Sequence, residues 1–238
     1  MNTSNRQFRG LTKRELSLFA AQSIVAALRG IYRRHPSSYT DVMIAVRSPL
    51  DSNTIVVNSP RVDFSRVEVG DLIKVRLGDN KLRADGLDYP KIQMALTAFQ
   101  ENPERNALVL IRSADSEAFS ILGRELAPLG RDSALWFARH AVFDLIYGSS
   151  GASGAVFRNL ISIYPYVLVK SEGVLVCESS LARAITVALA GDRACRLQLA
   201  VSHIPEISLI PEHEISSINE FEMSPEIVDQ NFTKLTEH

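Results

Sequence analysis

The chain has 238 residues, 46% hydrophobic and 22% charged, a globular composition that excludes a disordered, collagen-like or coiled-coil chain. Its 26 Lys and Arg against 27 Asp and Glu give a formal net charge of −1, which lacks the positive excess typical of proteins that bind nucleic acid or anionic membranes. Two cysteines outside any C-x-x-C pair, and no apolar run near the ~20 residues of a membrane span, predict a cytoplasmic protein without disulfides.

The first half of the chain alternates helix and strand signals. Thr12 and Glu15 have the spacing of a capping box, and apolar residues follow at steps of three and four. The continuous apolar run at 107–111 is typical of a strand buried on both faces. In chain order we expect a helix at 13–34, strands at 42–46, 54–57 and 72–77, a helix at 90–101, a strand at 107–111 and a short helix at 116–122.

The second half continues the alternation and then changes character. We expect an aromatic-rich strand or helix at 136–147, a glycine-rich loop at 148–154, a helix at 155–162, strands at 166–170 and 174–177, and a long helix from Ser179 or Ser180 to about 203. Mixed strands and helices favour an α/β protein with helices on both faces of a central sheet.

Three segments are predicted along the chain. Residues 1–10 form a polar lead, which the basic residues ahead of Glu15 also make compatible with a transit peptide. Residues 11–205 form the folded domain. Residues 206–238 are rich in Asp and Glu, with Lys234 as the only Lys or Arg, and we interpret them as an acidic tail with one short helix after Ser224 and Pro225.

Four stretches have the order and layout of one known family: residues 47–75, 99–113, 166–176 and 180–185. On these stretches the chain resembles the class II aldolase/adducin family, which contains sugar-phosphate aldolases and epimerases, some decarboxylases, and the non-enzymatic head domain of adducin. The resemblance implies a three-layer α/β/α sandwich with a central, largely antiparallel sheet. It also implies an oligomer, because active members are commonly tetramers.

The residues that perform chemistry in the family are replaced in this chain. Active members bind zinc or another divalent metal with three histidines, and use a carboxylate as acid and base. The resemblance places Leu110 and Arg112 at the first two histidine positions, Glu172 at the third, and Lys91 at about the position of the acid/base glutamate. The family's glycine-containing phosphate loop is also missing between Tyr39 and Arg47. We therefore expect no metal and no other cofactor.

The residues themselves lead to the same expectation. Zinc sites need neutral imidazoles that converge at about 2.0–2.1 Å, and a lysine and an arginine at such a site repel a divalent cation. No two of the five histidines are two, three or four residues apart; they are His35, His140, His203, His213 and His238.

Two interpretations of Lys91, Arg112 and Glu172 remain open. In the first they form a repurposed pocket, in which Arg112 binds a small anionic ligand and Lys91, with a lowered pKa, acts as a nucleophile or base. In the second, which we favour, Glu172 pairs with Lys91 or Arg112 in an internal salt bridge that fills a disused site. Asp115 and Glu117 are candidates for acid–base chemistry or for stabilising the start of a short helix.

Two functional hypotheses follow. The favoured one is a non-catalytic family member, a pseudoenzyme that serves as a structural or regulatory subunit of a homo-oligomer or of a hetero-oligomer with a paralogue. The alternative is a lyase, epimerase or decarboxylase that acts on a small phosphorylated or carboxylated substrate without the family's metal, or with an unusual one. Loss of the metal weakens the alternative, because the enediolate then loses its main stabiliser.

Overall fold

The computed structural model describes residues 12–34, 39–58, 62–78, 89–144 and 152–237, and the structural statements below concern these residues. The strands are β1 (Tyr39–Arg47), β2 (Thr54–Asn58), β3 (Leu72–Arg76), β4 (Ala107–Ser113), β5 (His140–Phe143), β6 (Tyr166–Val169) and β7 (Gly173–Glu178). The helices are α1 (Lys13–Arg34), α2 (Tyr89–Glu101), α3 (Ala114–Ile121), α4 (Arg131–Ala134), α5 (Ala152–Ile163), α6 (Leu181–Val201), α7 (Glu212–Glu222) and α8 (Pro225–Thr236), with a 3-10 turn η2 at Val69–Asp71.

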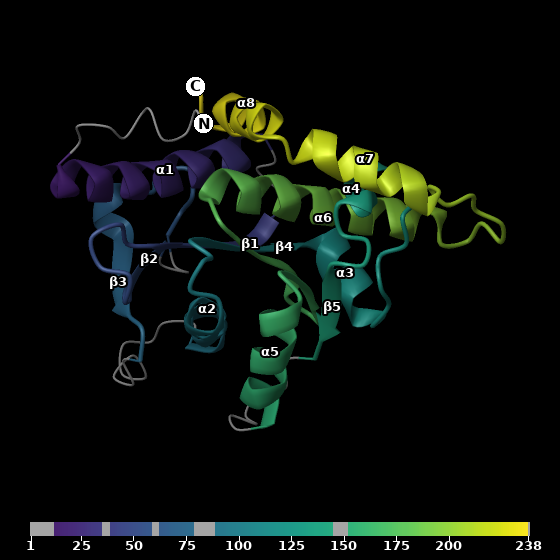
Figure 1. Ribbon diagram of the computed structural model, residues 1–238, viewed down its shortest axis with the longest axis horizontal. Helices are drawn as coiled ribbons and strands as arrows, with labels where there is room; N and C mark the ends of the chain where they lie inside the picture. The colour runs from purple at the N-terminus through teal and green to yellow at the C-terminus, as the bar shows by residue number, and fades with distance from the viewer. Residues whose placement is uncertain (1–11, 35–38, 59–61, 79–88, 145–151, 238) are drawn as a thin grey trace.

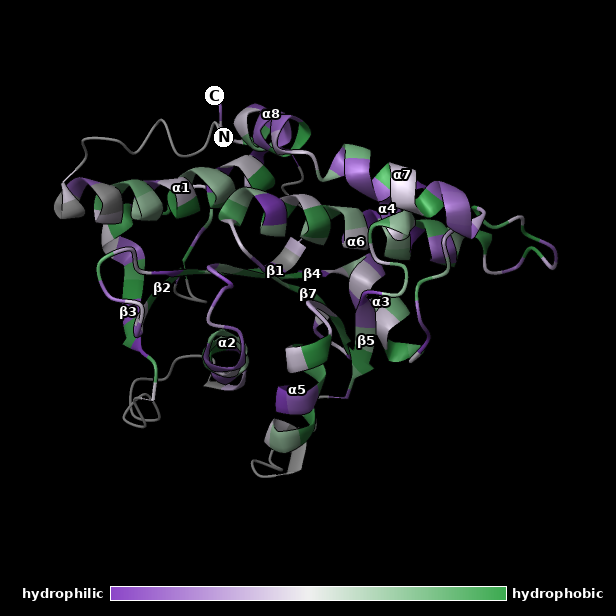
Figure 2. Ribbon diagram, in the orientation of Figure 1, coloured by the Kyte–Doolittle hydropathy of each residue, from purple (hydrophilic) through white to green (hydrophobic). Residues whose placement is uncertain are grey.

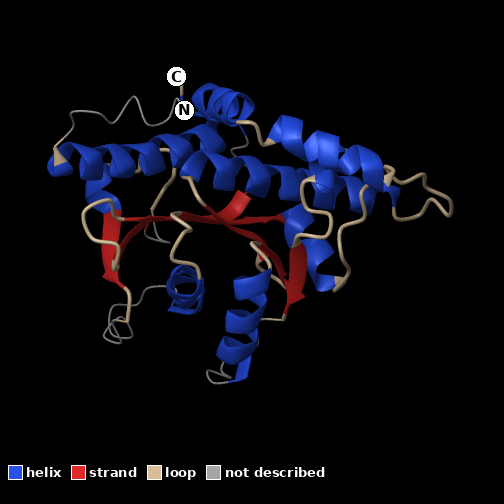
Figure 3. Ribbon diagram, viewed as in Figure 1, coloured by secondary structure: helices blue, strands red, loops and turns tan. Residues whose placement is uncertain are grey.

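The strands form one sheet in the order β3-β2-β1-β4-β7-β6-β5. The neighbouring strands are antiparallel, except that β5 and β6 run parallel. Helices lie on both faces of the sheet, with α1, α6 and α8 on one side and α2 and α5 on the other (Figures 1 and 3). The predicted α/β architecture with a central, largely antiparallel sheet is confirmed.

Strand β4 shows why helices cover both faces of the sheet. Val109 and Ile111 belong to the hydrophobic cluster that α1 and α6 complete, whereas Leu108 and Leu110 belong to the cluster under α2 and α5. Side chains alternate between the faces of a strand, so a continuous apolar run supplies both clusters. Figure 2 shows this central part of the sheet as hydrophobic. None of the described helices combines the length and apolarity needed to cross a membrane.

The structure resolves the open expectation for residues 136–144, whereas residues 145–147 lie outside the described ranges. His140–Phe143 form a strand, β5, which pairs in parallel with β6. Trp136 lies just before this strand and is fully buried, and its indole Nε1 donates to the carbonyl of Val187 at 2.9 Å. Most of the expected glycine-rich loop lies outside the described residues, but Gly154 belongs to α5, which begins earlier than predicted.

The acidic tail contains more helix than the sequence analysis predicted. The helix expected after Pro225 is present as α8, but α7 precedes it and was not expected. Met223, Val228 and Leu235 join the hydrophobic cluster of α1 and α6. Val228, Phe232 and Leu235 follow a spacing of four and then three residues, which is an apolar stripe that the high acidic content obscured.

Helix α8 lies directly on α1 through one close approach. A Cβ atom added to Gly30 would stand 2.2 Å from the carbonyl oxygen of Leu235, a distance that no side chain tolerates. Arg34, at the end of α1, also donates from Nη2 to the carbonyl of Lys234. The last turn of α8 therefore depends on the absence of a side chain at Gly30.

We predict that Gly30→Ala displaces the end of α8 and lowers the free energy of unfolding by about 1–3 kcal/mol, the usual cost of overpacking. Limited proteolysis should then remove the C-terminal helix faster than in the unmodified protein, while urea denaturation reports the loss of stability. Gly70→Ala is the matched control, because a Cβ atom there meets nothing within 4 Å. Equal stability and equal cleavage of the two variants would contradict this packing.

Candidate functional site

Five charged side chains gather at the end of the sheet where β1 and β7 begin and β4 ends. They are Asp41 of β1, Lys91 of α2, Arg112 of β4, Glu117 of α3 and Glu172 of the β6–β7 turn. Asp41 lies directly opposite Arg112 in the antiparallel register, just after an irregularity between Tyr39 and Asp41. Opposed residues of antiparallel strands project from the same face, so these two side chains share the side of the sheet on which α2 packs.

A tight turn brings Glu172 to this end of the sheet. Ser171 and Gly173 on either side of it both have positive φ, at 62° and 94°. A Cβ atom on Gly173 would stand 2.3 Å from the carbonyl oxygen of Ile111, so this position combines a left-handed backbone with a close approach that only glycine permits. The turn therefore places the Glu172 side chain beside β4 and leaves it 3% exposed.

Lys91 connects helix α2 to two carboxylates. It lies in the first turn of α2, and its Nζ donates to Oδ2 of Asp41 and lies 3.0 Å from Oε2 of Glu172. The Lys91 and Glu172 side chains are only 5% and 4% exposed, whereas that of Asp41 is 20% exposed. A buried charge is costly unless it is paired, and here the ammonium and both carboxylates meet that requirement together.

Arg112 forms the outer part of the same cluster. Its Nε and Nη2 donate to the two carboxylate oxygens of Glu117 at 3.1 and 3.2 Å, a bidentate pair, and its Nη1 lies 3.9 Å from Oε2 of Glu172. The Arg112 side chain is 32% exposed, so part of the guanidinium faces solvent. Three carboxylates and two cations leave the cluster one negative charge in excess.

The electrostatics of Lys91 are opposite to those of a catalytic lysine. Burial alone would lower its pKa, but the hydrogen bonds and charges of Asp41 and Glu172 outweigh burial and raise the pKa above its usual value. A nucleophile or base needs the neutral amine, which a raised pKa makes scarcer. The pKa of Arg112 is likewise raised, mainly by its hydrogen bonds to Glu117.

The structure brings together all three residues that the sequence analysis singled out. Lys91 and Glu172 are in direct contact, and Arg112 lies within ion-pair distance of Glu172 but beyond hydrogen-bonding range. Asp41 was not predicted to take part, because one acid at the start of an apolar strand has no local signature. Glu117 pairs with Arg112, while Asp115 pairs instead with Arg196 of α6 at 2.9 Å.

The side chains at this end of the sheet do not suit a divalent cation. Leu110 is in the hydrophobic core, and the ammonium of Lys91 lies where it would repel a metal bound by Glu172. Across the described part of the chain, no three His, Cys, Asp or Glu side chains are grouped to hold a metal ion. Among these side chains, neither the family's zinc nor another divalent metal finds a fitting set of ligands.

The one buried histidine that the structure describes is engaged at both ring nitrogens. His140 Nε2 accepts from the backbone N–H of Leu126 at 3.0 Å, so its Nδ1 carries the proton toward the carbonyl of Trp136 at 2.7 Å. Burial lowers the pKa of this imidazole, which favours the neutral form that the two contacts require. His140 therefore serves the packing of β5.

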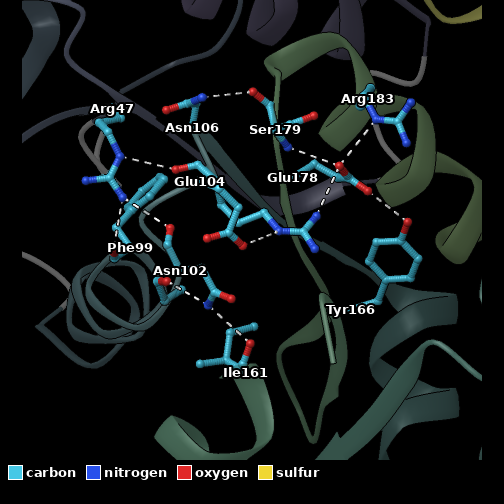
Figure 4. Close-up of polar contacts among 12 residues, drawn as sticks. Arg47, Phe99, Asn102, Glu104, Asn106, Ile161, Tyr166, Glu178, Ser179 and Arg183 are labelled. Carbon is cyan, nitrogen blue, oxygen red and sulfur yellow. Dashed lines mark hydrogen bonds and ion pairs between the residues drawn. The ribbon is translucent and has the colours of Figure 1, made fainter. Parts of the chain in front are cut away.

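A second buried carboxylate, Glu178, lies at the opposite end of β7 (Figure 4). It accepts hydrogen bonds from the Tyr166 hydroxyl at 3.0 Å, from Arg105 and Arg183 at 3.3 Å each, and from the Ser179 backbone at 3.0 Å. These donors join β6, the start of α6 and the turn before β4, so we interpret Glu178 as a structural anchor.

A third arginine, Arg47, holds the loop between α2 and β4 at the same end of the sheet as Glu178. Arg47 donates to the carbonyls of Phe99, Asn102 and Arg105, and its guanidinium lies 5.1 Å from the centre of the Phe99 ring. Asn102 in turn donates to the carbonyl of Ile161 of α5 (Figure 4). These contacts fasten the end of α2 to β1 and α5.

The sequence identifies the family to which this chain belongs, and the fold agrees with it. Residues 22–199 match the model of the class II aldolase and adducin N-terminal domain, and the chain belongs to that family. The solved L-fuculose 1-phosphate aldolase from Glaciozyma antarctica superimposes with a TM-score of 0.80 at 19% identity, covering 95% of this chain and 92% of that one. At that identity the likeness shows the shared fold.

Two curated relatives are similar in sequence. The "Meiotically up-regulated gene 14 protein" of Schizosaccharomyces pombe is 24% identical over 202 residues, 82% of this chain and 77% of that protein. "Decarboxylase NovR" of Streptomyces niveus is 25% identical over 162 residues, which are 66% of this chain and 60% of that protein's length.

We predict that Lys91→Met lowers the free energy of unfolding by about 3–5 kcal/mol in urea denaturation, because it leaves the buried carboxylate of Glu172 facing the part-buried carboxylate of Asp41. Adding Glu172→Gln to this variant should restore part of the loss by removing one of those charges. Lys170→Met is the control: its partner Asp144 is exposed, and a surface pair contributes only about 0–1 kcal/mol. A Lys91→Met variant no less stable than the control would rule out a structural ion cluster.

Proposed function

We propose that this chain is a non-catalytic member of its family, a pseudoenzyme that acts as a structural or regulatory subunit of an oligomer. The observation that carries the proposal is the Lys91 ammonium bound between Asp41 and Glu172. These charges occupy the end of the sheet where the resemblance places the family's metal and its acid/base group.

The chemistry of the cluster supports this proposal. General acid–base catalysis needs a group that exchanges a proton near the working pH. The pKa of Lys91 is displaced upward, away from that range, and Glu172 is nearly inaccessible to solvent. A cluster in which every charged group contacts an opposite charge stabilises a fold, whereas a working site leaves a reactive group available to the substrate.

The surface offers candidate contacts for an oligomer. Ile121 and Leu122 at the end of α3, and Val156 and Ile163 on α5, are large apolar side chains that are 47–64% exposed. Such residues are candidates for a protein–protein interface where they adjoin one another. We propose a homo-oligomer or a hetero-oligomer with a paralogue. The two free cysteines, both buried, support the cytoplasm as the proposed compartment.

A second candidate function is a lyase, epimerase or decarboxylase that works through Lys91, Arg112 and Glu172. The similarity to a protein named decarboxylase favours it, as does the partial exposure of Arg112, whose guanidinium can bind a carboxylate or phosphate. In this alternative a small anionic substrate displaces Glu117 from Arg112. The raised pKa of Lys91 argues against it, because the lysine then supplies charge and no nucleophile.

An activity panel separates the two candidates. The purified chain is assayed with divalent metal for cleavage of L-fuculose 1-phosphate, for sugar-phosphate epimerisation and for decarboxylation of small keto acids. We expect no turnover above that of heat-denatured protein, together with an oligomer in light scattering. Turnover that Glu172→Gln abolishes without unfolding the chain would overturn the proposal in favour of the enzyme.

A further inference from the structure

A cavity of about 250 Å³ is lined by residues of α1, α6 and α8. These three helices lie on the face of the sheet opposite α2 (Figure 1). Ile31, Ile185, Leu189 and Phe232 give it apolar walls from all three helices. Lys91, Glu172 and Arg112 do not line it, so it is separate from the charged cluster. Since one water occupies about 30 Å³ of liquid, the cavity has room for a molecule of one ring with short substituents.

Four cations line the cavity: Arg34, Arg193, Arg196 and Lys234. Two are neutralised, because Arg193 pairs with Asp132 at 2.6 and 2.8 Å and Arg196 pairs with Asp115 at 2.9 Å.

The other two cations leave positive charge uncompensated. Arg34 donates to a backbone carbonyl, and within the described ranges no carboxylate lies within ion-pair distance of the Lys234 ammonium. A basic residue near a helix C-terminus is favoured by the helix dipole, which accounts for Arg34 in α1 and Lys234 in α8 separately. The dipole does not explain why both side chains line the same cavity.

The floor of the cavity is a buried polar group. Asp192 of α6 is 8% exposed and accepts a hydrogen bond from the hydroxyl of Ser113. Tyr39, at the start of β1, also lines the cavity close to Asp192. The interior therefore offers hydroxyl and carboxyl groups together with apolar walls. Its four cations face the three carboxylates of Asp115, Asp132 and Asp192, which leaves one positive charge in excess, on the side of Arg34 and Lys234.

We propose that this cavity binds a small organic monocarboxylate. The apolar body of the ligand packs against Ile185, Leu189 and Phe232, and its carboxylate pairs with Lys234 and Arg34. A dianion such as a phosphate ester fits less well, because Asp115 and Asp192 line the same space. The inference stands independently of the proposed function, since it uses other residues and the other face of the sheet.

Binding here would connect the two ends of the chain. The ligand contacts α1, α6 and α8 at once, and the last turn of α8 packs closely against α1 at Gly30. Occupancy therefore strengthens the docking of α8, which a thermal shift and slower proteolysis of the C-terminal helix both report.

Benzoate is the probe, with its neutral methyl ester and inorganic phosphate as comparisons. We expect a saturable rise in melting temperature and saturable calorimetric binding with benzoate at up to about 10 mM, a range suited to a ligand of this size. The ester and phosphate should bind at least tenfold more weakly. Lys234→Gln should weaken benzoate binding at least tenfold, whereas Lys74→Gln, an exposed lysine on β3, should leave it unchanged.

Asn231→Trp provides a second variant, because Asn231 is an exposed lining residue and a large ring there obstructs the cavity without removing a buried contact. It should abolish benzoate binding in a folded protein. The proposal is overturned by the absence of saturable benzoate binding, by equal binding of the methyl ester, or by binding that both Lys234→Gln and Asn231→Trp leave intact. These results do not depend on whether the activity panel finds turnover.

Discussion

The ammonium of Lys91 between Asp41 and Glu172 is the contact on which this end of the molecule depends. It joins the first turn of α2 to β1 and to the β6–β7 turn, three segments that are distant in sequence. Without the Lys91 ammonium, the carboxylates of Asp41 and Glu172 would face each other with no compensating charge, so the three act as a unit. Arg112 and Glu117 extend this unit toward solvent, so the cluster is buried at Lys91 and Glu172 and most accessible at its outer edge.

The fold and the chemistry of a protein family depend on different residues. An apolar pattern on both faces of the sheet is sufficient to build the sandwich, which explains a TM-score of 0.80 at only 19% identity. Function depends instead on a few side chains at the strand ends. In this chain, buried ionic networks occupy both ends of β7, at Glu172 and at Glu178, so the same strand is fixed from two sides.

Much of the fold could be predicted from local patterns. The apolar run at 107–111 identified β4, and the capping box of Thr12 and Glu15 is present, with Glu15 accepting from the Thr12 backbone at 2.6 Å. The family resemblance was sufficient to place Lys91, Arg112 and Glu172 near one another. Asp41 was missed, because its role arises from the register of β1 against β4, and the residues next to it in the sequence give no signal of that role. Helix α7 was missed, because within its own residues only Ile215 is buried.

The protonation state of Lys91 tests the central claim most directly. The ¹³Cε resonance of this lysine, assigned by comparison with Lys91→Met, can be followed in a pH titration of the folded protein. The ion cluster predicts that Lys91 remains an ammonium through about pH 10.4, the ordinary pKa of lysine, and loses its proton only above it. A titration midpoint near neutral pH would contradict the cluster and would favour a catalytic amine.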